Sequence, residues 1–425
     1  MLVYFKVGNY KSIKDPIVIN FAATAINEHQ DTNVFEKGKT KLLKTVLLYG
    51  ANASGKSKIL DAFVIYRALI LDSAGYNSTR RVPVIPFDLN ADTREQPSYF
   101  ETEFILKNKR YRYGFEADEK SIRKEWLLEV KATTQTSIFL RIGQRFQVEY
   151  KKFLNAEHLE TKCNENALFL SVADQWAVPL AKNIYSWFYD IYTIHGLMDD
   201  EYKEHTNELI KDPEYKVLIN QMMQKADLGI NSIEVIEITE EDKKRILMNT
   251  PDNLKESVGR VIDQDASPVL TKHYAYDELG NVIDEIAFDM AVHESEGTQK
   301  FYNIIGVILY AVKNGRVVVI DELDARLHTL LTKAIIRVFN ANDIKTEAQL
   351  FAVAHDTAIM DRDLLRRDQI YIVEKDRFAA TKIVNLVEYK VRKETPFDKN
   401  YLEGKYGGIP FIENFESLLK DGEKK

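Results

Sequence analysis

The chain has 425 residues, a formal net charge of −7 and a hydrophobic content of 45%. This length supplies two or three domain-sized units, and the apolar content is enough for a sizeable core. Cys163 is the only cysteine, which excludes an intramolecular disulfide and a cysteine-based zinc site. Residues 1–13 look like a strand, and no apolar run reaches the about 20 residues of a membrane span, so we expect a cytoplasmic protein without a membrane partner. The net charge leaves nucleic acid binding open, because a basic groove can lie on an acidic protein.

The most informative stretch of the sequence is residues 46–70. Apolar and aromatic residues at 46–49 predict a buried strand, and residues 58–70 predict a helix. Between them, residues 50–57 read Gly-Ala-Asn-Ala-Ser-Gly-Lys-Ser, which is the G-x-x-x-x-G-K-S pattern of a phosphate-binding loop. The strand–loop–helix context makes a chance glycine-rich turn a weak alternative.

Each residue type in this pattern has a physical role. Gly50 and Gly55 let the backbone turn successive N–H groups towards an anion, and the start of the helix adds a partial positive charge. Lys56 can reach the β- and γ-phosphates of a nucleotide, and the Ser57 hydroxyl can bind Mg²⁺. The residues that we expect to bind the nucleotide here are Gly50, Asn52, Ser54, Gly55, Lys56, Ser57 and Lys58.

The region after the loop changes from strand to helix patterns. Four stretches separated by turn sequences predict an antiparallel β subdomain, namely Phe100–Leu106, Tyr111–Glu116, Trp126–Val130 and Arg145–Tyr150. Residues 178–227 look helical, and their aromatic residues Trp187 and Phe188, with Tyr192, fit a core better than a base-stacking platform. Residues 232–239 alternate like a strand, and the charged stretch 240–263 suggests a mobile helix.

A short polar segment precedes an apolar helix in the second half of the chain. Residues 294–299 read Glu-Ser-Glu-Gly-Thr-Gln, and residues 301–312 have a helical apolar pattern. Ser295 can cap that helix, and Gly297 allows a close approach to a ligand. Taken alone, this segment would be an ordinary helix start.

Two further strands end in residues that can do chemistry. Residues 317–320 are β-branched, as a strand buried on both faces requires, and Asp321 and Glu322 follow at once. Asp321 can hold the Mg²⁺ shell opposite the phosphate-binding loop, and Glu322 can polarise a water towards the γ-phosphate. A second buried strand in residues 349–354 leads to His355, which we interpret as a γ-phosphate sensor.

The order of these motifs resembles the ABC-type ATPase heads of the RecF, SMC and OLD proteins. The likeness covers about residues 1–150 and 265–390, with an unmatched segment between them. It implies an α/β P-loop NTPase fold with a mixed central sheet, flanking helices, an antiparallel β subdomain and a helical insertion. That insertion has too few residues and no sustained heptads for a long coiled coil, so we expect a compact lid or partner-docking element.

The resemblance also implies how the site residues divide between two copies of the chain. In these heads two subunits sandwich two ATP molecules, and the Ser-x-Gly-x-Gln signature caps the γ-phosphate bound by the other subunit. Ser295, Gly297 and Gln299 would therefore act in trans, and Asp324 takes the place of the inter-subunit Asp loop. The residues expected to act on the chain's own ATP and Mg²⁺ are Lys56, Ser57, Asp321, Glu322 and His355.

The sequence departs from the family pattern at several positions. Glu296 stands where many heads have Gly, Lys58 where Thr or Ser is usual, and Thr329 follows His328 where a subgroup often has Pro. The glutamine loop, a metal contact in these heads, is not obvious. Gln175 after an apolar run is the candidate, and an ordinary exposed glutamine is the alternative.

Several segments are similar to the RloA- or AbiL-type stand-alone ATPases of prokaryotic defence loci. They are Tyr111–Phe115, Glu125–Trp126, Arg367–Lys375 and Tyr401–Phe411, whereas Phe5–Ile13 looks like the opening strand of RecF-like heads. By association, this implies a role in antiphage defence or abortive infection. Only 70 residues follow His355 in the 425-residue chain, too few for the Toprim nuclease of OLD proteins, so we expect a separately encoded nuclease or toxin as effector.

We therefore predict an ATPase that forms a homodimer or higher homo-oligomer through ATP and controls an effector. The alternative is a RecF/SMC-like ATPase acting directly on DNA, which shares every ATPase residue. A GTPase would need an Asn-Lys-x-Asp guanine reader, which is absent, and a relic site would need a damaged catalytic set, whereas this one is intact. The expected regions are ATPase lobe I with the β subdomain (1–150), a mainly helical insertion or lid (151–264), ATPase lobe II (265–390) and a C-terminal extension (391–425).

Overall fold

A computed structural model of the chain describes residues 1–226, 229–251, 255, 267–341, 346–389 and 396–409. The chain divides into two compact units. Unit 1 consists of Met1–Ile194, Asn314–Leu323 and Ile336–Lys425, and unit 2 consists of His195–Lys313 and Asp324–Ile335. The predicted α/β class with a mixed central sheet is confirmed.

The six-stranded sheet of unit 1 carries the motifs found in the sequence. Its strand order is β11-β15-β16-β5-β17-β18. The strands are β5 (Thr45–Tyr49), β11 (Tyr192–His195), β15 (Val317–Asp321), β16 (Gln349–Val353), β17 (Ile370–Lys375) and β18 (Thr381–Asn385). The pairs β15/β16, β16/β5 and β5/β17 are parallel, and β17/β18 is antiparallel. The C-terminal ends of four adjacent strands therefore meet at one edge, which is where open α/β sheets bind ligands.

The central strands of this sheet are apolar because both of their faces are covered. Every residue of β5 and β16 is buried, and in β15 only Asp321 is partly exposed. Continuous apolar runs of this kind are expected for parallel strands inside an α/β layer. The strand predictions at 46–49, 317–320 and 349–354 are thus confirmed in position and type.

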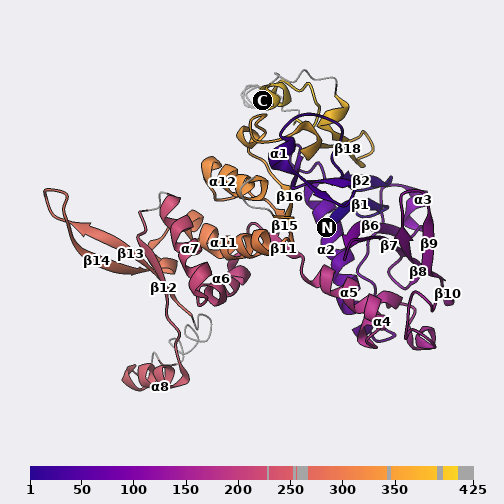
Figure 1. The fold of residues 1–425 in the computed structure, drawn as a ribbon, viewed down its shortest axis with the longest axis horizontal. Helices are drawn as coiled ribbons and strands as arrows, with labels where there is room; N and C mark the ends of the chain where they lie inside the picture. The colour runs from indigo at the N-terminus through magenta and orange to yellow at the C-terminus, as the bar shows by residue number, and fades with distance from the viewer. Residues whose placement is uncertain (227–228, 252–254, 256–266, 342–345, 390–395, 410–425) are drawn as a thin grey trace, which may run out of the picture. The chain divides into compact units, whose positions relative to one another are not determined.

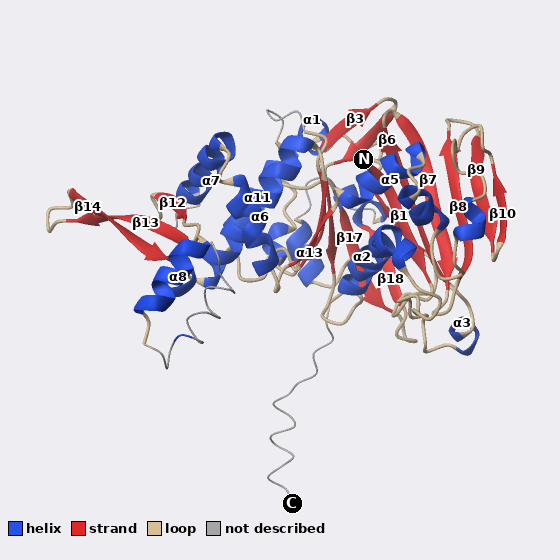
Figure 2. Cartoon of the chain, turned by 90° about the horizontal axis from the view of Figure 1, so that it is seen from below, coloured by secondary structure: helices blue, strands red, loops and turns tan. Residues whose placement is uncertain are grey.

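The second sheet of unit 1 is antiparallel and has the order β10-β9-β8-β7-β6-β1-β2. Figure 2 shows these strands in red, with β6 to β10 following one another along the sheet. The bounds are β1 (Leu2–Gly8), β2 (Ile17–Asn20), β6 (Ser98–Leu106), β7 (Lys109–Ala117), β8 (Ile122–Val130), β9 (Gln135–Ile142) and β10 (Arg145–Val148). Each of the four predicted strand stretches coincides with one of these strands, and β9 is a fifth that the pattern did not indicate.

Helix α2 (Lys56–Asp72) connects the two sheets, since it packs on β1 of one and on β15 and β16 of the other. The Phe63 ring lies 5.1 Å from the Phe5 ring and 6.2 Å from the Phe351 ring, both edge-to-face. Edge-to-face aromatic pairs of this kind add to the stabilisation from burial alone. The helix that begins in the phosphate-binding loop is therefore fixed by a core that spans both sheets.

Two helices that we had placed in the insertion belong to unit 1. α4 (Phe169–Gln175) and α5 (Pro179–Tyr189) pack on α2, and the Phe188 ring lies 5.6 Å from the Tyr66 ring of α2. The predicted boundary at residue 150 is therefore not a boundary of the structure, because residues 151–194 complete the core around α2. The aromatic cluster of Trp187 and Phe188 is core, as its pattern indicated.

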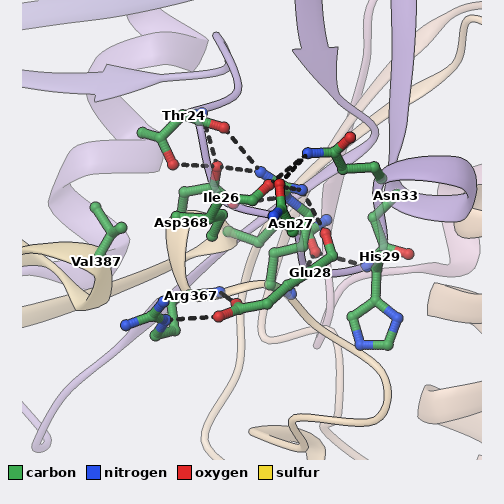
Figure 3. Close-up of polar contacts among 12 residues, drawn as sticks. Thr24, Ile26, Asn27, Glu28, His29, Asn33, Arg367, Asp368 and Val387 are labelled. Atoms are coloured by element: carbon green, nitrogen blue, oxygen red, sulfur yellow. Dashed lines mark hydrogen bonds and ion pairs between the residues drawn. The ribbon is translucent and has the colours of Figure 1, made fainter. Parts of the chain in front are cut away.

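A buried polar cluster holds residues 24–33 against the start of β17. The guanidinium of Arg366 donates to both oxygens of Asp368 at 2.7 and 2.8 Å, and the Thr24 backbone N–H and hydroxyl also donate to Asp368. Arg367 Nε donates to Glu28 Oε1 at 2.8 Å, as Figure 3 shows. Arg366 and Asp368 are almost completely buried, so this charge pair is satisfied by the chain itself.

The remaining short α-helices and strands of unit 1 are α1 (Gln30–Asn33), β3 (Val34–Lys37), β4 (Thr40–Leu43), α3 (Ala91–Arg94) and α13 (Phe397–Leu402).

Unit 2 combines helices with a small antiparallel sheet of order β12-β13-β14. Its main elements are α6 (Lys203–Leu209), α7 (Pro213–Lys225), β12 (Ser232–Val235), α8 (Glu240–Asn249), β13 (Val269–Tyr276), β14 (Val282–Asp289), α10 (Met290–His293) and α11 (Glu296–Asn314). In Figure 1, the β13–β14 hairpin extends away from the helices of its own unit. α12 (Thr329–Asn340) continues from unit 2 into unit 1.

The predicted boundary at residue 264 also differs from the structure. β13 and β14, which we had placed in lobe II, pair with β12, and Thr206 of α6 donates to the Asn303 carbonyl of α11 at 2.9 Å. The signature helix therefore packs with the insertion in one unit. The strand predicted at 232–239 is limited to β12, and the predicted charged helix occupies Glu240–Asn249. The rest of that predicted helix, at 252–254 and 256–263, lies outside the described residues. The same is true of 391–395 and 410–425 in the predicted C-terminal extension. None of the described helices is both long and apolar enough to cross a membrane.

Candidate nucleotide-binding site

A cavity of about 500 Å³ lies at the edge where β5, β15, β16 and β17 end. This volume falls in the range of small-molecule sites. The residues that line it are Ser12, Asn52, Ala53, Ser54, Gly55, Lys56, Ser57, Lys58, Glu322, His355 and Lys375. The structure thus brings together the predicted loop, the predicted carboxylate and the predicted histidine from three separate parts of the sequence.

The two glycines of the loop are required by close contacts with the neighbouring strands β17 and β18. Gly55 precedes α2 with φ of 111°, and a Cβ there would lie 2.1 Å from Thr381 Oγ1. A Cβ on Gly50 would lie 2.1 Å from the Val373 carbonyl oxygen. No other residue type fits either position without moving β17 or β18. The loop is therefore packed closely against β17 and β18, an approach that glycine allows at these two positions.

The polar groups of the loop suit a phosphate. Lys56 is buried, and its ammonium group donates to the carbonyl oxygens of Gly50 at 2.6 Å and Ala51 at 2.9 Å. The Ser54 hydroxyl is buried and has no hydrogen-bond partner among the described residues. A buried hydroxyl without a partner is costly, and a phosphate oxygen would supply one.

The Ser57 hydroxyl lies beside the first carboxylate of the Asp-Glu pair. Its Oγ donates to Asp321 Oδ1 at 3.2 Å, so the start of α2 and the end of β15 meet at this point. Both groups offer hard oxygen atoms, which suit Mg²⁺. Among the described residues no group of three or more His, Cys, Asp or Glu side chains could hold a metal. A site with so few protein ligands fits Mg²⁺, which usually keeps several waters and shares phosphate oxygens.

Glu322 and His355 line the same cavity from neighbouring strands. Glu322 has φ of 54°, a left-handed conformation that is uncommon for a residue with a side chain. The next N–H, that of Leu323, donates to the Val353 carbonyl at 3.0 Å, which fixes this turn against β16. Strained backbone of this kind often occurs at functional sites. The geometry gives a carboxylate and an imidazole that line one cavity just after the ends of two adjacent buried strands, β15 and β16.

Gln175 does not reach this cavity, so its prediction as a metal contact is wrong. It is exposed at the C-terminal end of α4, and the nearby Ser171 hydroxyl accepts from the Ala74 N–H just beyond the far end of α2. The 17-residue helix α2 separates that end from the phosphate-binding loop by about 25 Å. Gln175 is the ordinary exposed glutamine that the sequence left as the alternative.

The three signature residues lie in unit 2 at the start of α11. Ser295 Oγ accepts from the Thr298 N–H at 3.2 Å and so caps the helix, while Gln299 Nε2 donates to the Glu294 carbonyl at 3.0 Å. A Cβ on Gly297 would lie 2.6 Å from the Arg326 carbonyl oxygen.

The loop that follows the Asp-Glu pair is tied to the signature. Lys300 Nζ donates to the Ala325 carbonyl at 2.6 Å, and Arg326 forms an ion pair with Glu296 at 3.3 Å. Glu296, the residue that departs from the family pattern, therefore turns towards the 324–328 loop of its own chain. The signature helix start and the loop that contains Asp324 form one cluster.

Three cavity residues were not predicted. Ser12 and Lys375 belong to segments that we had used only for the resemblance, and Ala53, with φ of 62°, lies inside the loop itself. A single serine or lysine outside a motif carries no signal in one sequence. Only the pairing of β17 with β5 shows that Lys375 reaches the loop.

A family model described as "AAA domain, putative AbiEii toxin, Type IV TA system" matches residues 46–361, well over half of the chain. The chain belongs to this family. The matched region includes the phosphate-binding loop, the signature, the Asp-Glu pair and His355. The protein is thus an AAA-type P-loop ATPase, and ATP is the nucleotide of this class.

The chain is also similar to solved structures of Smc heads. One is an Smc head bound to the C-terminal winged-helix domain of ScpA, with 15% identity, TM-score 0.47, and coverage of 90% of this chain and 96% of the other. The SMC head domain from Thermotoga maritima has 11% identity, TM-score 0.41, and coverage of 90% and 98%. An Smc head with an extended coiled coil, bound to a ScpA domain derived from Pyrococcus furiosus, has 14% identity, TM-score 0.38, and coverage of 91% and 97%. No curated protein matches the chain.

Proposed function

We propose that this cytoplasmic ATPase binds and hydrolyses ATP with Mg²⁺, and that the ATP state controls the association of two copies. The observation that carries this proposal is the single cavity formed by the phosphate-binding loop, Glu322 and His355, with the Ser57–Asp321 contact beside it. These groups come from three adjacent parallel strands and from the helix that follows one of them. Their convergence is hard to explain without a nucleotide phosphate as ligand.

Each group has a distinct role in this proposal. Lys56 exchanges its backbone carbonyl partners for the β- and γ-phosphates, and the Ser54 hydroxyl donates to a phosphate oxygen. Ser57 and Asp321 hold Mg²⁺, which when bound offsets the negative charge of the phosphates. Glu322 accepts a proton from the attacking water, and His355 contacts the γ-phosphate.

The second copy supplies the signature. Ser295 is exposed at the N-terminus of the 19-residue helix α11, which can face an anion. Together with the resemblance to ABC-type heads, this supports a sandwich in which Ser295, Gly297 and Gln299 complete the partner's site. Two such composite sites would convert the ATP state into a protein conformation.

We further propose that the assembly regulates a separately encoded effector, a nuclease or toxin, in antiphage defence or abortive infection. The similarity of several segments to RloA- or AbiL-type ATPases supports this, and so does the reference to a toxin and a toxin–antitoxin system in the family description. The effector itself has to be found by co-purification with the products of neighbouring genes.

The test is to measure ATP turnover and molar mass, by light scattering, with and without MgATP. We expect the parent chain to hydrolyse ATP and to shift towards a dimer with MgATP, whereas Lys56→Ala should do neither. Turnover without any change in mass would contradict the ATP-driven association. Strong, salt-sensitive DNA binding would instead favour the alternative of an ATPase that acts directly on DNA.

A further inference from the structure

A lysine outside every recognised motif faces the nucleotide cavity. Lys375 is the last residue of β17, its side chain is exposed, and it lines the cavity together with Ser12. Within the described part of the chain no carboxylate pairs with it. Among the described residues its charge is thus not offset by an ion pair, and the ammonium group is available to an anion in the cavity.

The pairing of β17 with β5 sets the position of Lys375. The two strands are parallel, with Ile372 opposite Tyr49, so residues 373–375 run alongside the start of the phosphate-binding loop. The close approach of Gly50 to the Val373 carbonyl shows this contact directly. In the sheet, β17 lies on one side of β5, whereas β16 and β15, which lead to His355 and Glu322, lie on the other. Lys375 is thus placed on the side of the loop away from the residues of the γ-phosphate.

The backbone that presents Lys375 is held in place. Glu374 Oε2 accepts from the Gly408 N–H at 3.2 Å, and a Cβ on Gly407 would lie 2.5 Å from the same oxygen. Adjacent residues of a strand point to opposite faces. The anchoring of Glu374 on residues 407–408 therefore directs Lys375 to the other face, where the cavity lies.

Ser12 lies on the same side of the phosphate-binding loop as Lys375. Its hydroxyl lies 2.8 Å from Thr381 Oγ1 and 3.1 Å from the place where a Cβ on Gly55 would be. A nucleotide whose γ-phosphate lies near Glu322 and His355 has its α-phosphate and ribose directed towards this side. The cavity therefore offers a third lysine, in addition to Lys56 and Lys58 of the loop, and it lies at the nucleoside end.

We propose that Lys375 is a further nucleotide-binding residue, whose ammonium group contacts the α-phosphate. This inference rests on the proposed function, because it takes the γ-phosphate to lie near Glu322 and His355. The contact is present before, during and after cleavage of the bond between the β- and γ-phosphates. It contributes uniform binding, which changes KM and leaves kcat unchanged. It also stabilises ADP as much as ATP.

The experiment measures equilibrium binding of MgADP and of a non-hydrolysable ATP analogue with Mg²⁺, by calorimetry. For Lys375→Ala we expect the Kd of both ligands to rise about tenfold, as for loss of a charge-assisted hydrogen bond, with kcat within twofold of the parent. Lys375→Arg keeps the charge and should recover most of the affinity. Arg377→Ala is the matched control, because it removes an exposed cation two residues further on that does not line the cavity. Its Kd values should stay within twofold of the parent.

Two results would overturn the inference. Parent-like binding of both ligands by Lys375→Ala would show that the lysine makes no contact, and weaker binding of the ATP analogue alone would place it at the γ-phosphate. Lys56→Ala separates the inference from the proposed function. If Lys56→Ala loses binding while Lys375→Ala does not, only the inference fails, whereas parent-like binding by both would show that this cavity does not hold the nucleotide.

Discussion

The Ser57 hydroxyl donates to Asp321 Oδ1 at 3.2 Å, although 264 residues separate them in the chain. Ser57 stands in the first turn of α2, and Asp321 ends β15, two strands away from β5. The contact joins the phosphate-binding loop to the Asp-Glu strand at the place where Mg²⁺ would bind. It also accounts for the position of Glu322, the next residue, at the rim of the cavity.

Removal of the Asp321 charge should weaken Mg²⁺ binding. For Asp321→Asn we expect the Mg²⁺ concentration at half-maximal turnover to rise about 10- to 100-fold, because the amide cannot offset the cation. The measurement is a Mg²⁺ titration of ATP turnover. Asp15→Asn removes an exposed carboxylate that pairs with Lys382 outside this cavity and is the matched control. An unchanged Mg²⁺ dependence for Asp321→Asn would remove this residue from the metal site.

Glu322→Gln should separate binding from hydrolysis. The amide keeps the shape of the side chain and cannot accept a proton, so we expect turnover to fall at least about 100-fold while the Kd for ATP stays within twofold. The variant should also accumulate as an ATP-bound dimer in light scattering. Near-parent turnover would mean that another group activates the water.

Truncation of Phe63 should destabilise unit 1. The ring is fully buried between the two sheets, so Phe63→Ala should lower the free energy of unfolding by about 3–5 kcal/mol. The three tryptophans, Trp126, Trp176 and Trp187, all lie in unit 1, so their fluorescence during urea unfolding reports this unit. Val64→Ala, at a position 37% exposed on the same helix, should change the midpoint little. Equal effects of the two variants would contradict the position of α2 in the core.

The single cysteine should be unreactive in the folded chain. Burial raises the pKa of the Cys163 thiol to about 12, and Arg141 Nη1 donates to its sulfur at 3.3 Å. Thiolate is the reactive form, so at pH 8 only roughly one thiol in ten thousand is ionised. Alkylation with iodoacetamide should be negligible at pH 8 and should become rapid in urea, where the pKa returns to about 8.5. Rapid labelling of the folded chain would show that this region is open.

The motifs of the cavity could be predicted because each lies directly after a strand with a strong apolar pattern. The phosphate-binding loop, Glu322 and His355 follow β5, β15 and β16, whose buried runs are unmistakable in the sequence. Parallel pairing of these strands then brings their ends together. Local pattern and tertiary arrangement agree here, so the sequence is sufficient.

Other parts could not be predicted because they depend on long-range packing. Gln175 follows an apolar run, but that run is a helix beyond the far end of α2. β9 begins with three polar residues that are exposed or partly exposed, so its sequence lacks a clear alternation of apolar and polar residues. The boundary predicted at residue 150 is wrong because α4 and α5 pack on α2. The place of Lys375 at the cavity follows only from the pairing of β17 with β5. None of these contacts leaves a local signal.

The structure shows that Ser295 is a better position than Gly297 for a substitution that tests the signature. Gly297 approaches the Arg326 carbonyl so closely that a side chain there would disturb its own chain. Ser295 is exposed, and Asp caps a helix as well as Ser does. Ser295→Asp should therefore keep α11 intact while it places a negative charge against the partner's γ-phosphate. We expect it to bind ATP as the parent does and to lose hydrolysis.

The most direct test of the composite site is to mix Lys56→Ala with Ser295→Asp and to measure ATP turnover. Neither variant should be active alone. In a mixed dimer, one site has an intact loop and an intact signature, whereas the other has both defects, so turnover should reappear and approach half the parent rate per mixed dimer. Exchange of subunits is checked separately, with fluorescent labels on the two variants. If labelled subunits exchange and no turnover returns, the two copies do not complete each other's sites in the way proposed.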